Sequence, residues 1–181
     1  MSKLVEKKIS SQTVYKGNFL DVKKDNVVLP NGKNSTREWI NHPGAVVIVP
    51  ILPNGRIALI RQFRYAMGSE FIELPAGKID KGETPDECAI RELEEEIGFK
   101  TKNLNFIAMI HPAIGFANEN MSLYLATDLV QTNINRDSDE FLELMPTSLE
   151  HALDLVWSNK ITDVKTIIGI LWYQKIYQES K

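Results

Sequence analysis

The longest apolar run in the chain covers residues 44–52, and its nine residues include Pro50. A transmembrane helix needs about 20 consecutive apolar residues, so this run is too short to cross a bilayer and we expect no membrane partner. The β-branched stretch at residues 45–49 predicts a buried strand instead. A turn at residues 53–55 and an antiparallel strand at residues 56–63 are predicted to follow it.

Composition places the chain among ordinary globular proteins. Its 181 residues suit one domain with a small appendage, and 43% apolar with 25% charged residues exclude a disordered, collagen-like or disulfide-stapled protein. The single cysteine, Cys88, cannot form an internal disulfide, and residues 1–10 lack the apolar run of a secretory signal, so we expect a cytoplasmic protein. The net charge of −3 argues against a nucleic-acid partner.

The N-terminal part of the chain is predicted to form a small antiparallel β region. Residues 13–19 and 20–29 alternate in character, and the Pro-Asn-Gly cluster at residues 30–32 is typical of a hairpin turn. This part has few large apolar residues of its own. We therefore expect residues 1–43 to pack either on the main domain, residues 44–181, or on a second subunit.

A helix at residues 85–97 has the clearest end signals in the chain. Thr84 is a suitable N-cap, Pro85 occupies the first helical position, and Glu87 completes a T-x-x-E capping box. Gly98 stands where the left-handed residue that ends a helix belongs.

The remaining elements have weaker signals. Two helices are predicted to close the chain, the first from the capping box of Thr147 and Glu150 to about Trp157, and the second from near Thr162. The second helix is expected to bury Val164, Ile167, Ile168, Leu171 and Ile176. Further strands are predicted at residues 71–74, 104–110, 121–127 and 141–144.

Negative charge is concentrated between Glu83 and Glu96. Seven acids and one base, Arg91, give this segment a net charge of −6, which leaves +3 for the rest of the chain. Glu92, Glu95 and Glu96 stand at i, i+3 and i+4, so they fall within about 100° of one another on the helix. Like charges at this spacing destabilise a helix unless a cation neutralises them, and oxygen ligands favour Mg²⁺ or Mn²⁺. The alternative is an ordinary solvated face.

The spacing of this segment matches a known signature. Residues 77–99 fit the pattern G-x5-E-x7-R-E-U-x-E-E-x-G-U, in which U is a bulky aliphatic or aromatic residue, and the chain therefore resembles the Nudix hydrolases. The resemblance implies an α/β/α sandwich with a mixed β-sheet. It also implies that Glu92, Glu95 and Glu96 bind Mg²⁺, that Glu95 and Glu96 are catalytic, and that the backbone carbonyl of Ala76 joins the metal ligands.

Three further segments, residues 61–65, 71–80 and 139–144, resemble the ADP-ribose and nucleotide-sugar pyrophosphatase branch of that family. This resemblance implies Mg²⁺-dependent hydrolysis of ADP-ribose or a related nucleoside diphosphate sugar to a nucleoside monophosphate and a sugar phosphate. It also implies a homodimer formed through the N-terminal strands. In that branch the arginine that matches Arg64 contacts the substrate phosphates, and we place Glu73 in the same substrate site.

Other candidate site residues also follow from the resemblance. Glu140 matches a mobile glutamate that helps to activate the attacking water, and Glu119, which we place in the substrate site, is the alternative base. Trp39 matches an aromatic residue that stacks on the nucleobase, although burial in a core or a dimer interface explains it equally well. Arg91 is expected to orient a glutamate of the signature or to pair with Glu73.

One departure from the branch leaves the substrate open. The ADP-ribose-specific subgroup carries a proline about 15 residues after the signature, where this chain has Ile114. Other nucleoside diphosphate sugars therefore stay possible substrates. A Nudix enzyme that acts on nucleoside triphosphates, dinucleoside polyphosphates or CoA is the alternative, and a non-catalytic ligand sensor is a third hypothesis.

Overall fold

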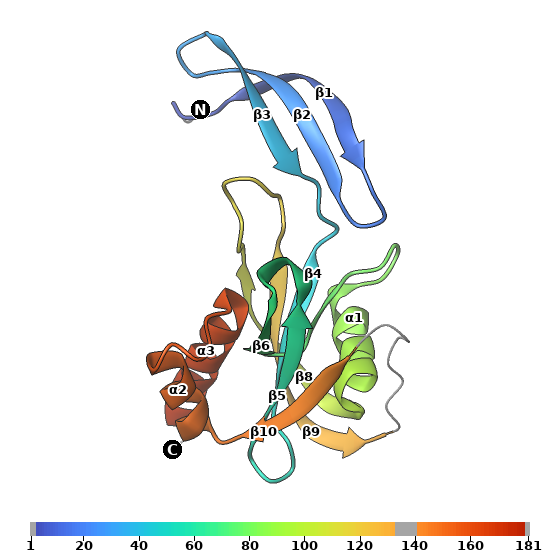
Figure 1. The fold of residues 1–181 in the computed structure, drawn as a ribbon, viewed down its shortest axis with the longest axis vertical. Helices are drawn as coiled ribbons and strands as arrows, with labels where there is room; N and C mark the ends of the chain where they lie inside the picture. The colour runs from blue at the N-terminus through green and yellow to red at the C-terminus, as the bar shows by residue number, and fades with distance from the viewer. Residues whose placement is uncertain (1–2, 133–140, 180–181) are drawn as a thin grey trace. The chain divides into compact units, whose positions relative to one another are not determined.

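The computed structural model of the chain describes residues 3–132 and 141–179 (Figure 1). The described residues form two compact units. Unit 1 contains residues 3–44 and 113–119, and unit 2 contains residues 45–112, 120–132 and 141–179. Within the described part of the chain, no helix combines the length and the apolar composition needed to cross a membrane.

Unit 1 is built on an antiparallel sheet of three strands, β1 (Lys7–Lys16), β2 (Asp21–Val28) and β3 (Asn34–Ile40). The predicted turn at residues 30–32 joins β2 to β3, and its glycine has a φ of +82°, a backbone conformation that glycine adopts at little cost. The third strand was not predicted from the sequence, because most of its residues are polar and do not alternate with apolar ones.

Unit 2 has two sheets at its centre. The first sheet contains, in spatial order, β7 (Ala76–Lys78), β4 (Ala45–Pro50), β9 (Met121–Gln131) and β8 (Phe99–Ile110). The second contains β10 (Leu142–Thr147), β5 (Ile57–Arg64) and β6 (Ser69–Glu73). β4 and β9 run parallel, whereas the other pairs are antiparallel, so the predicted mixed sheet is confirmed.

Helices cover these sheets on two sides (Figure 1). α1 (Pro85–Glu92) continues into a π-helical turn, η2 (Leu93–Ile97), on one side. α2 (Leu149–Trp157) and α3 (Val164–Glu179) lie on the other side, and a short 3₁₀ turn, η1 (Tyr65–Met67), connects β5 to β6. Together with the central sheets, these helices form the expected α/β/α sandwich.

The longest apolar run of the chain forms β4, which lies between two hydrophobic cores. Val47 and Val49 belong to a core that also contains Ile170 of α3, whereas Val46 and Ile48 belong to a second core on the side of α1. A strand that is covered on both faces requires apolar residues at every position rather than at alternate ones. The run at residues 45–49 is therefore the middle layer of the sandwich.

The local end signals of α1 are confirmed. The Thr84 hydroxyl accepts the Glu87 backbone N–H at 3.3 Å, and the Glu87 carboxylate accepts the Thr84 backbone N–H at 2.9 Å. Gly98 ends the helical segment with a φ of +73°. The sequence did not predict the change from α to π geometry at Leu93, and such turns are frequent at functional sites.

Two predictions for the C-terminal helices were wrong in detail. α2 is capped by Ser148, whose side chain accepts the His151 N–H at 3.2 Å, whereas Thr147 is a buried end of β10 and donates its hydroxyl to the Met145 carbonyl. α3 begins at Val164, and this residue is exposed. The fully buried residues of α3 are Lys165, Thr166, Gly169, Ile170 and Tyr173, whereas Ile167 and Ile168 are partly buried and pack against the core as predicted.

Gly169 allows α3 to lie close to β4 and to the end of β6. A Cβ atom at this position would lie 2.3 Å from Cδ1 of Leu74 and 3.2 Å from Cγ2 of Val49. We expect Gly169→Val to lower the free energy of unfolding by about 1–3 kcal/mol, because overpacking displaces both side chains. Urea denaturation would measure the change. Lys175→Val on the exposed side of α3 is the control for placing a β-branched residue in this helix, and an equal loss in both variants would contradict the packing argument.

Candidate active site

Arg91 lies at the centre of the acidic segment. Its guanidinium donates to both oxygens of Glu83, at 2.8 and 3.0 Å, and Nη1 donates to Glu92 and to Glu95 at 2.8 Å each. Arg91 therefore contacts three glutamates of the signature, as one of the two sequence hypotheses stated. It does not pair with Glu73, which has other cationic partners.

These contacts shift the pKa values of the two groups in opposite directions. Hydrogen bonding to Glu83 raises the pKa of Arg91 well above its usual value, and hydrogen bonding to Arg91 lowers the pKa of Glu83 to about 2. Both groups therefore stay charged at neutral pH. Arg91 is the internal counter-ion of the acidic segment.

Two of the signature glutamates are buried against the strand β7. Glu96 is 2% exposed and accepts the Ala76 backbone N–H at 3.1 Å, and Glu92 is 8% exposed. A Cβ atom on Gly77 would lie only 1.7 Å from Oε1 of Glu92, so this position needs glycine. The structure therefore brings the side chains of Glu92 and Glu96 together with the backbone of residues 76 and 77, and Glu95 joins them through Arg91.

This group offers the donors that a hard divalent cation prefers. Carboxylate and backbone carbonyl oxygens suit Mg²⁺ or Mn²⁺, whereas zinc prefers histidine and cysteine. In the ranges 3–132 and 141–179, no three acidic, histidine or cysteine side chains are already arranged to hold a metal ion. Nη1 of Arg91 lies 2.8 Å from a carboxylate oxygen of Glu92 and 2.8 Å from one of Glu95.

A second charged cluster surrounds the carboxylate of Glu73. Glu73, at the end of β6, is buried and accepts Nε and Nη2 of Arg64 at 2.6 and 2.7 Å. Its Oε2 also accepts the Lys165 Nζ, which donates in addition to Asp163 at 2.9 Å. Burial alone would raise the pKa of Glu73, but Arg64 and Lys165 together hold it below its usual value.

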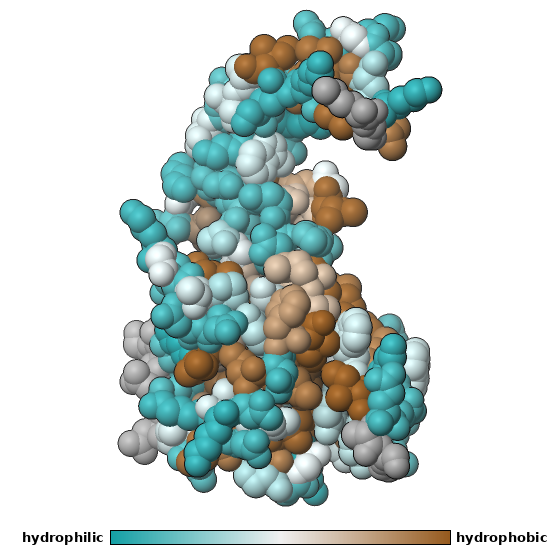
Figure 2. All heavy atoms as spheres, turned by 180° about the vertical axis from the view of Figure 1, so that it is seen from behind, coloured by the Kyte–Doolittle hydropathy of each residue, from teal (hydrophilic) through white to brown (hydrophobic). Residues whose placement is uncertain are grey.

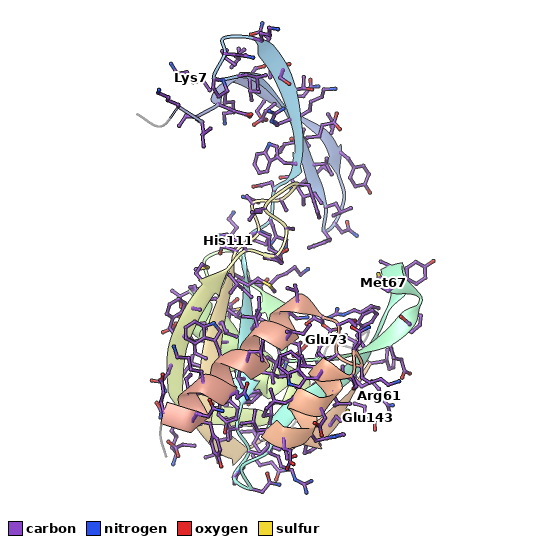
Figure 3. All side chains as sticks on the ribbon, turned by 90° about the vertical axis from the view of Figure 1, so that its left-hand side faces the viewer. Lys7, Arg61, Met67, Glu73, His111 and Glu143 are labelled. Atoms are coloured by element: carbon purple, nitrogen blue, oxygen red, sulfur yellow. The ribbon has the colours of Figure 1, made fainter. Side chains whose placement is uncertain are left out.

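Arg64 connects this cluster to the acidic segment. Hydrogen bonding to Glu73 raises its pKa, and the negative charges of Glu96 and Asp163 add to the effect. A cavity of about 220 Å³ lies beside the cluster, and its lining consists of Arg64, Met67, Phe71, Glu73, Asp163 and Lys165. Figure 3 labels Glu73 near the start of α3 and Met67 at the tip of the β5–β6 hairpin. The cavity is smaller than the roughly 300 Å³ of a typical ligand pocket, so it suits one part of a ligand.

Sequence reasoning missed Lys165 and Asp163. Lys165 is not one of the residues that the sequence predicted to be buried, and its partner Glu73 is 92 residues away from it along the chain. Asp163 stands directly before α3, and an aspartate at this position is a usable sequence signal because it is a preferred N-cap residue. In the structure its side chain accepts the Thr166 backbone N–H at 3.0 Å, as an N-cap does.

Arg61 points away from this cluster, as the alternation along β5 predicts. It pairs with Glu143 of β10 and lies 3.7 Å from Glu70 of β6. Figure 3 shows Arg61 and Glu143 side by side. Arg61 is therefore a partner of neighbouring strands rather than a member of the Glu73 cluster.

The remaining predicted residues lie outside unit 2 or outside the described part. Trp39 is half-buried in β3 of unit 1, opposite Lys23 of β2. Glu119 also belongs to unit 1, where its carboxylate lies 3.7 Å from Nε2 of His42. Glu140 lies outside the described residues. The roles given to Trp39, Glu119 and Glu140 stay predictions.

Glu83 makes the stability of this site depend on pH. Its pKa of about 2 in the folded protein lies below the ordinary 4.5, so its contribution is complete above pH 4.5 and is lost as the pH falls toward 2. Allowing for partial solvent exposure, we expect Glu83→Gln to lower the free energy of unfolding by about 1–2 kcal/mol at pH 7, and by much less at pH 3. Urea denaturation at both pH values would measure this difference.

The exposed Glu70, which lies 3.7 Å from Arg61, provides the control. Glu70→Gln is expected to change the free energy of unfolding by less than about 0.5 kcal/mol at either pH, because exposed ion pairs contribute little. A loss in Glu83→Gln that is the same at pH 7 and pH 3 would contradict the role of the Arg91 pair.

Comparison with known proteins supplies the family. Residues 41–164 match the NUDIX domain, and residues 6–40 match the nucleoside diphosphate sugar hydrolase N-terminal domain. The chain is 41% identical over 176 residues to the ADP-ribose pyrophosphatase of Bacillus subtilis (strain 168), with 96% of this chain and 95% of the relative covered. It is 36% identical over 177 residues to the methanol dehydrogenase activator of Bacillus methanolicus, with 96% of each chain covered.

Solved structures agree with these sequence matches. A crystal structure described as ADP compounds hydrolase superposes with a TM-score of 0.89 at 25% identity, over 99% of this chain and 98% of that one. The residues of the signature, the sandwich that holds them and the matched domain point to the same assignment. The chain therefore belongs to the Nudix hydrolase family.

Proposed function

We propose that the protein is a Mg²⁺-dependent pyrophosphatase that hydrolyses ADP-ribose, and related nucleoside diphosphate sugars, to a nucleoside monophosphate and a sugar phosphate. The observation that carries this proposal is the burial of Glu92 and Glu96 against the backbone of Ala76 and Gly77, with the Arg64 guanidinium close enough to interact with the charge of Glu96. Acidic groups for a metal and a basic group for phosphate are what cleavage of a diphosphate requires.

Glu92, Glu95, Glu96 and the carbonyl of Ala76 would hold Mg²⁺, for which Mn²⁺ can substitute. The bound ion would neutralise phosphate charge and lower the pKa of the attacking water. When the carboxylates of Glu92 and Glu95 bind the metal ion, Arg91 would keep its two hydrogen bonds to Glu83. Its guanidinium would therefore remain beside the site.

Substrate binding and proton transfer are assigned to other residues. The Arg64 guanidinium would bind phosphate oxygens, since its planar donors match them in pairs. Trp39 would stack on the nucleobase. Glu140 would take the proton of the attacking water, with Glu119 as the alternative base.

We also propose that the chain forms a homodimer through unit 1. Its support is the exposure of apolar side chains on this unit, where Figure 2 shows hydrophobic surface. The exposed residues include Leu4, Val5, Ile9, Val14 and Tyr15. Light scattering after size exclusion should give twice the chain mass of 20.6 kDa, and a monomer mass would overturn the proposal.

A small substrate panel tests the activity. Purified protein is incubated with ADP-ribose, a uridine diphosphate sugar, ATP, a dinucleoside polyphosphate and CoA, each with Mg²⁺ or with EDTA. The expected result is Mg²⁺-dependent release of AMP and ribose 5-phosphate from ADP-ribose. Release of pyrophosphate from ATP as the main reaction would support a triphosphatase, and ligand binding without any hydrolysis would support a sensor.

A further inference from the structure

The buried carboxylate of Glu73 has two cationic partners, although one would balance its charge. Arg64 binds it through two hydrogen bonds, and Lys165 binds one of the same oxygens. Lys165 also pairs with Asp163, so the four side chains form a network without net charge. Charge balance at Glu73 alone therefore does not explain why Lys165 contacts this carboxylate in addition to Arg64.

Lys165 is anchored independently of Arg64. Asp163 accepts the backbone N–H of Thr166 at 3.0 Å and its hydroxyl at 2.6 Å, which fixes the first turn of α3. The Thr166 hydroxyl in turn accepts the Leu74 N–H at 2.8 Å, which ties α3 to the residue after Glu73. Lys165 is consequently fixed to Glu73 from the helix side, through contacts that do not involve Arg64.

Arg64 is held less firmly. Its side chain is 44% exposed, whereas that of Lys165 is 10% exposed. Arg64 is also the last residue of β5, and the cavity of about 220 Å³ opens beside its guanidinium. Lys165 also lines this cavity, but of the two cations on Glu73, Arg64 has the more exposed side chain and is the one we expect to take another anion.

We propose that Lys165 is a positioning residue that allows Arg64 to move from Glu73 to a substrate phosphate. If Arg64 were the sole partner, its transfer would leave a buried carboxylate without a counter-ion, which is strongly unfavourable. With Lys165 in place, Glu73 keeps one cationic partner and the transfer becomes an exchange between two anions. This inference rests on the proposed function, because it takes the phosphates of the substrate as the second anion.

A purely structural role for Lys165 predicts a different pattern. In that case Lys165 joins β6 to α3, and its removal would lower stability and disturb kcat together with KM. In the exchange proposal its removal raises KM, because Arg64 becomes locked on Glu73. Removing the charge of Glu73 as well would then release Arg64, so the two substitutions would not be additive.

The experiment measures kcat and KM for ADP-ribose with Mg²⁺ in the wild type, Lys165→Met, Lys165→Arg, Glu73→Gln and the double variant Lys165→Met/Glu73→Gln. We expect Lys165→Met to raise KM at least about tenfold with kcat changed less than about threefold. The double variant should have a KM within about threefold of that of Glu73→Gln, and Lys165→Arg should restore a KM close to the wild-type value. Thermal melting verifies that each variant is folded.

Two outcomes would overturn the proposal. The first is an unchanged KM in folded Lys165→Met. The second is a KM in the double variant more than tenfold above that of Glu73→Gln, and this comparison remains available if Lys165→Met alone does not fold. Either result would mean that Lys165 acts without freeing Arg64.

Binding of inorganic pyrophosphate distinguishes a failure of the exchange proposal from a failure of the proposed function. Calorimetric titration should show binding to the wild type that Lys165→Met weakens at least about tenfold and that the double variant recovers to the level of Glu73→Gln. If the wild type binds pyrophosphate in this pattern but does not hydrolyse ADP-ribose, the proposed function fails and the exchange stands. Absence of pyrophosphate binding to the wild type would overturn the exchange.

Discussion

Replacing Glu96 with glutamine is expected to lower kcat for ADP-ribose hydrolysis by about 10²- to 10⁴-fold while the fold stays intact. Glutamine keeps an oxygen that can accept the Ala76 N–H, so the contact between the helical segment and β7 survives. It removes the negative charge that a divalent cation needs. Release of AMP, measured at saturating Mg²⁺, gives the rate, and the melting temperature reports the fold.

Glu94 provides the matched control for this prediction. It lies in the same π-helical turn, is half-buried, and pairs with Lys100 at 3.0 Å instead of facing β7. Glu94→Gln should change kcat by less than about threefold, because the Glu94 carboxylate pairs with Lys100 and is not one of the proposed metal ligands. Near-normal turnover by Glu96→Gln in the presence of metal would refute the assignment of Glu96 to the metal site.

Substituting alanine for Gly77 is expected to raise the Mg²⁺ concentration for half-maximal rate by at least about tenfold. The new Cβ atom would lie 1.7 Å from Oε1 and 1.9 Å from Cδ of Glu92, so this carboxylate must leave its place. Because Glu92 is buried and bonded to Arg91, it cannot move without disturbing the arrangement of the other acids. The rate of AMP release as a function of Mg²⁺ concentration would measure the effect.

Gly115 serves as the control for a glycine-to-alanine change. No atom lies within 4 Å of the position that its Cβ would take. Gly115→Ala should therefore leave the Mg²⁺ dependence as it is in the wild type. A normal Mg²⁺ dependence in Gly77→Ala would mean that Glu92 is not part of the metal site.

The sequence predicted those parts of the molecule that local patterns determine. The capping residues of α1 predicted its start, and the apolar run at residues 45–49 predicted β4. The signature from Gly77 onward predicted a cluster of glutamates, because helical spacing alone places Glu92, Glu95 and Glu96 near one another. The family and the α/β/α sandwich followed from that signature and are confirmed by the domain match and the fold.

The sequence did not predict the interactions that join distant parts of the chain. A helix is expected to bury its apolar residues, yet α3 buries Lys165 and Thr166, because Glu73 and the Leu74 N–H provide partners for their polar groups. The pairing of Arg64 with Glu73 was missed for a related reason. The register of β5 and β6 pairs Arg64 with Ser69 and Glu73 with Ile60, so the position of these residues in the hairpin does not predict that their side chains meet.

The contacts of Arg91 bear on whether the chain needs a metal ion in order to fold. In many small metalloproteins the ion supplies the free energy of folding, so the polypeptide stays unfolded until it acquires metal. Here the guanidinium of Arg91 already bridges Glu83, Glu92 and Glu95, so the chain carries the positive charge that closes the acidic cluster. The folded chain therefore has a cation of its own at this cluster, and we expect it to complete its fold in the absence of a divalent metal ion.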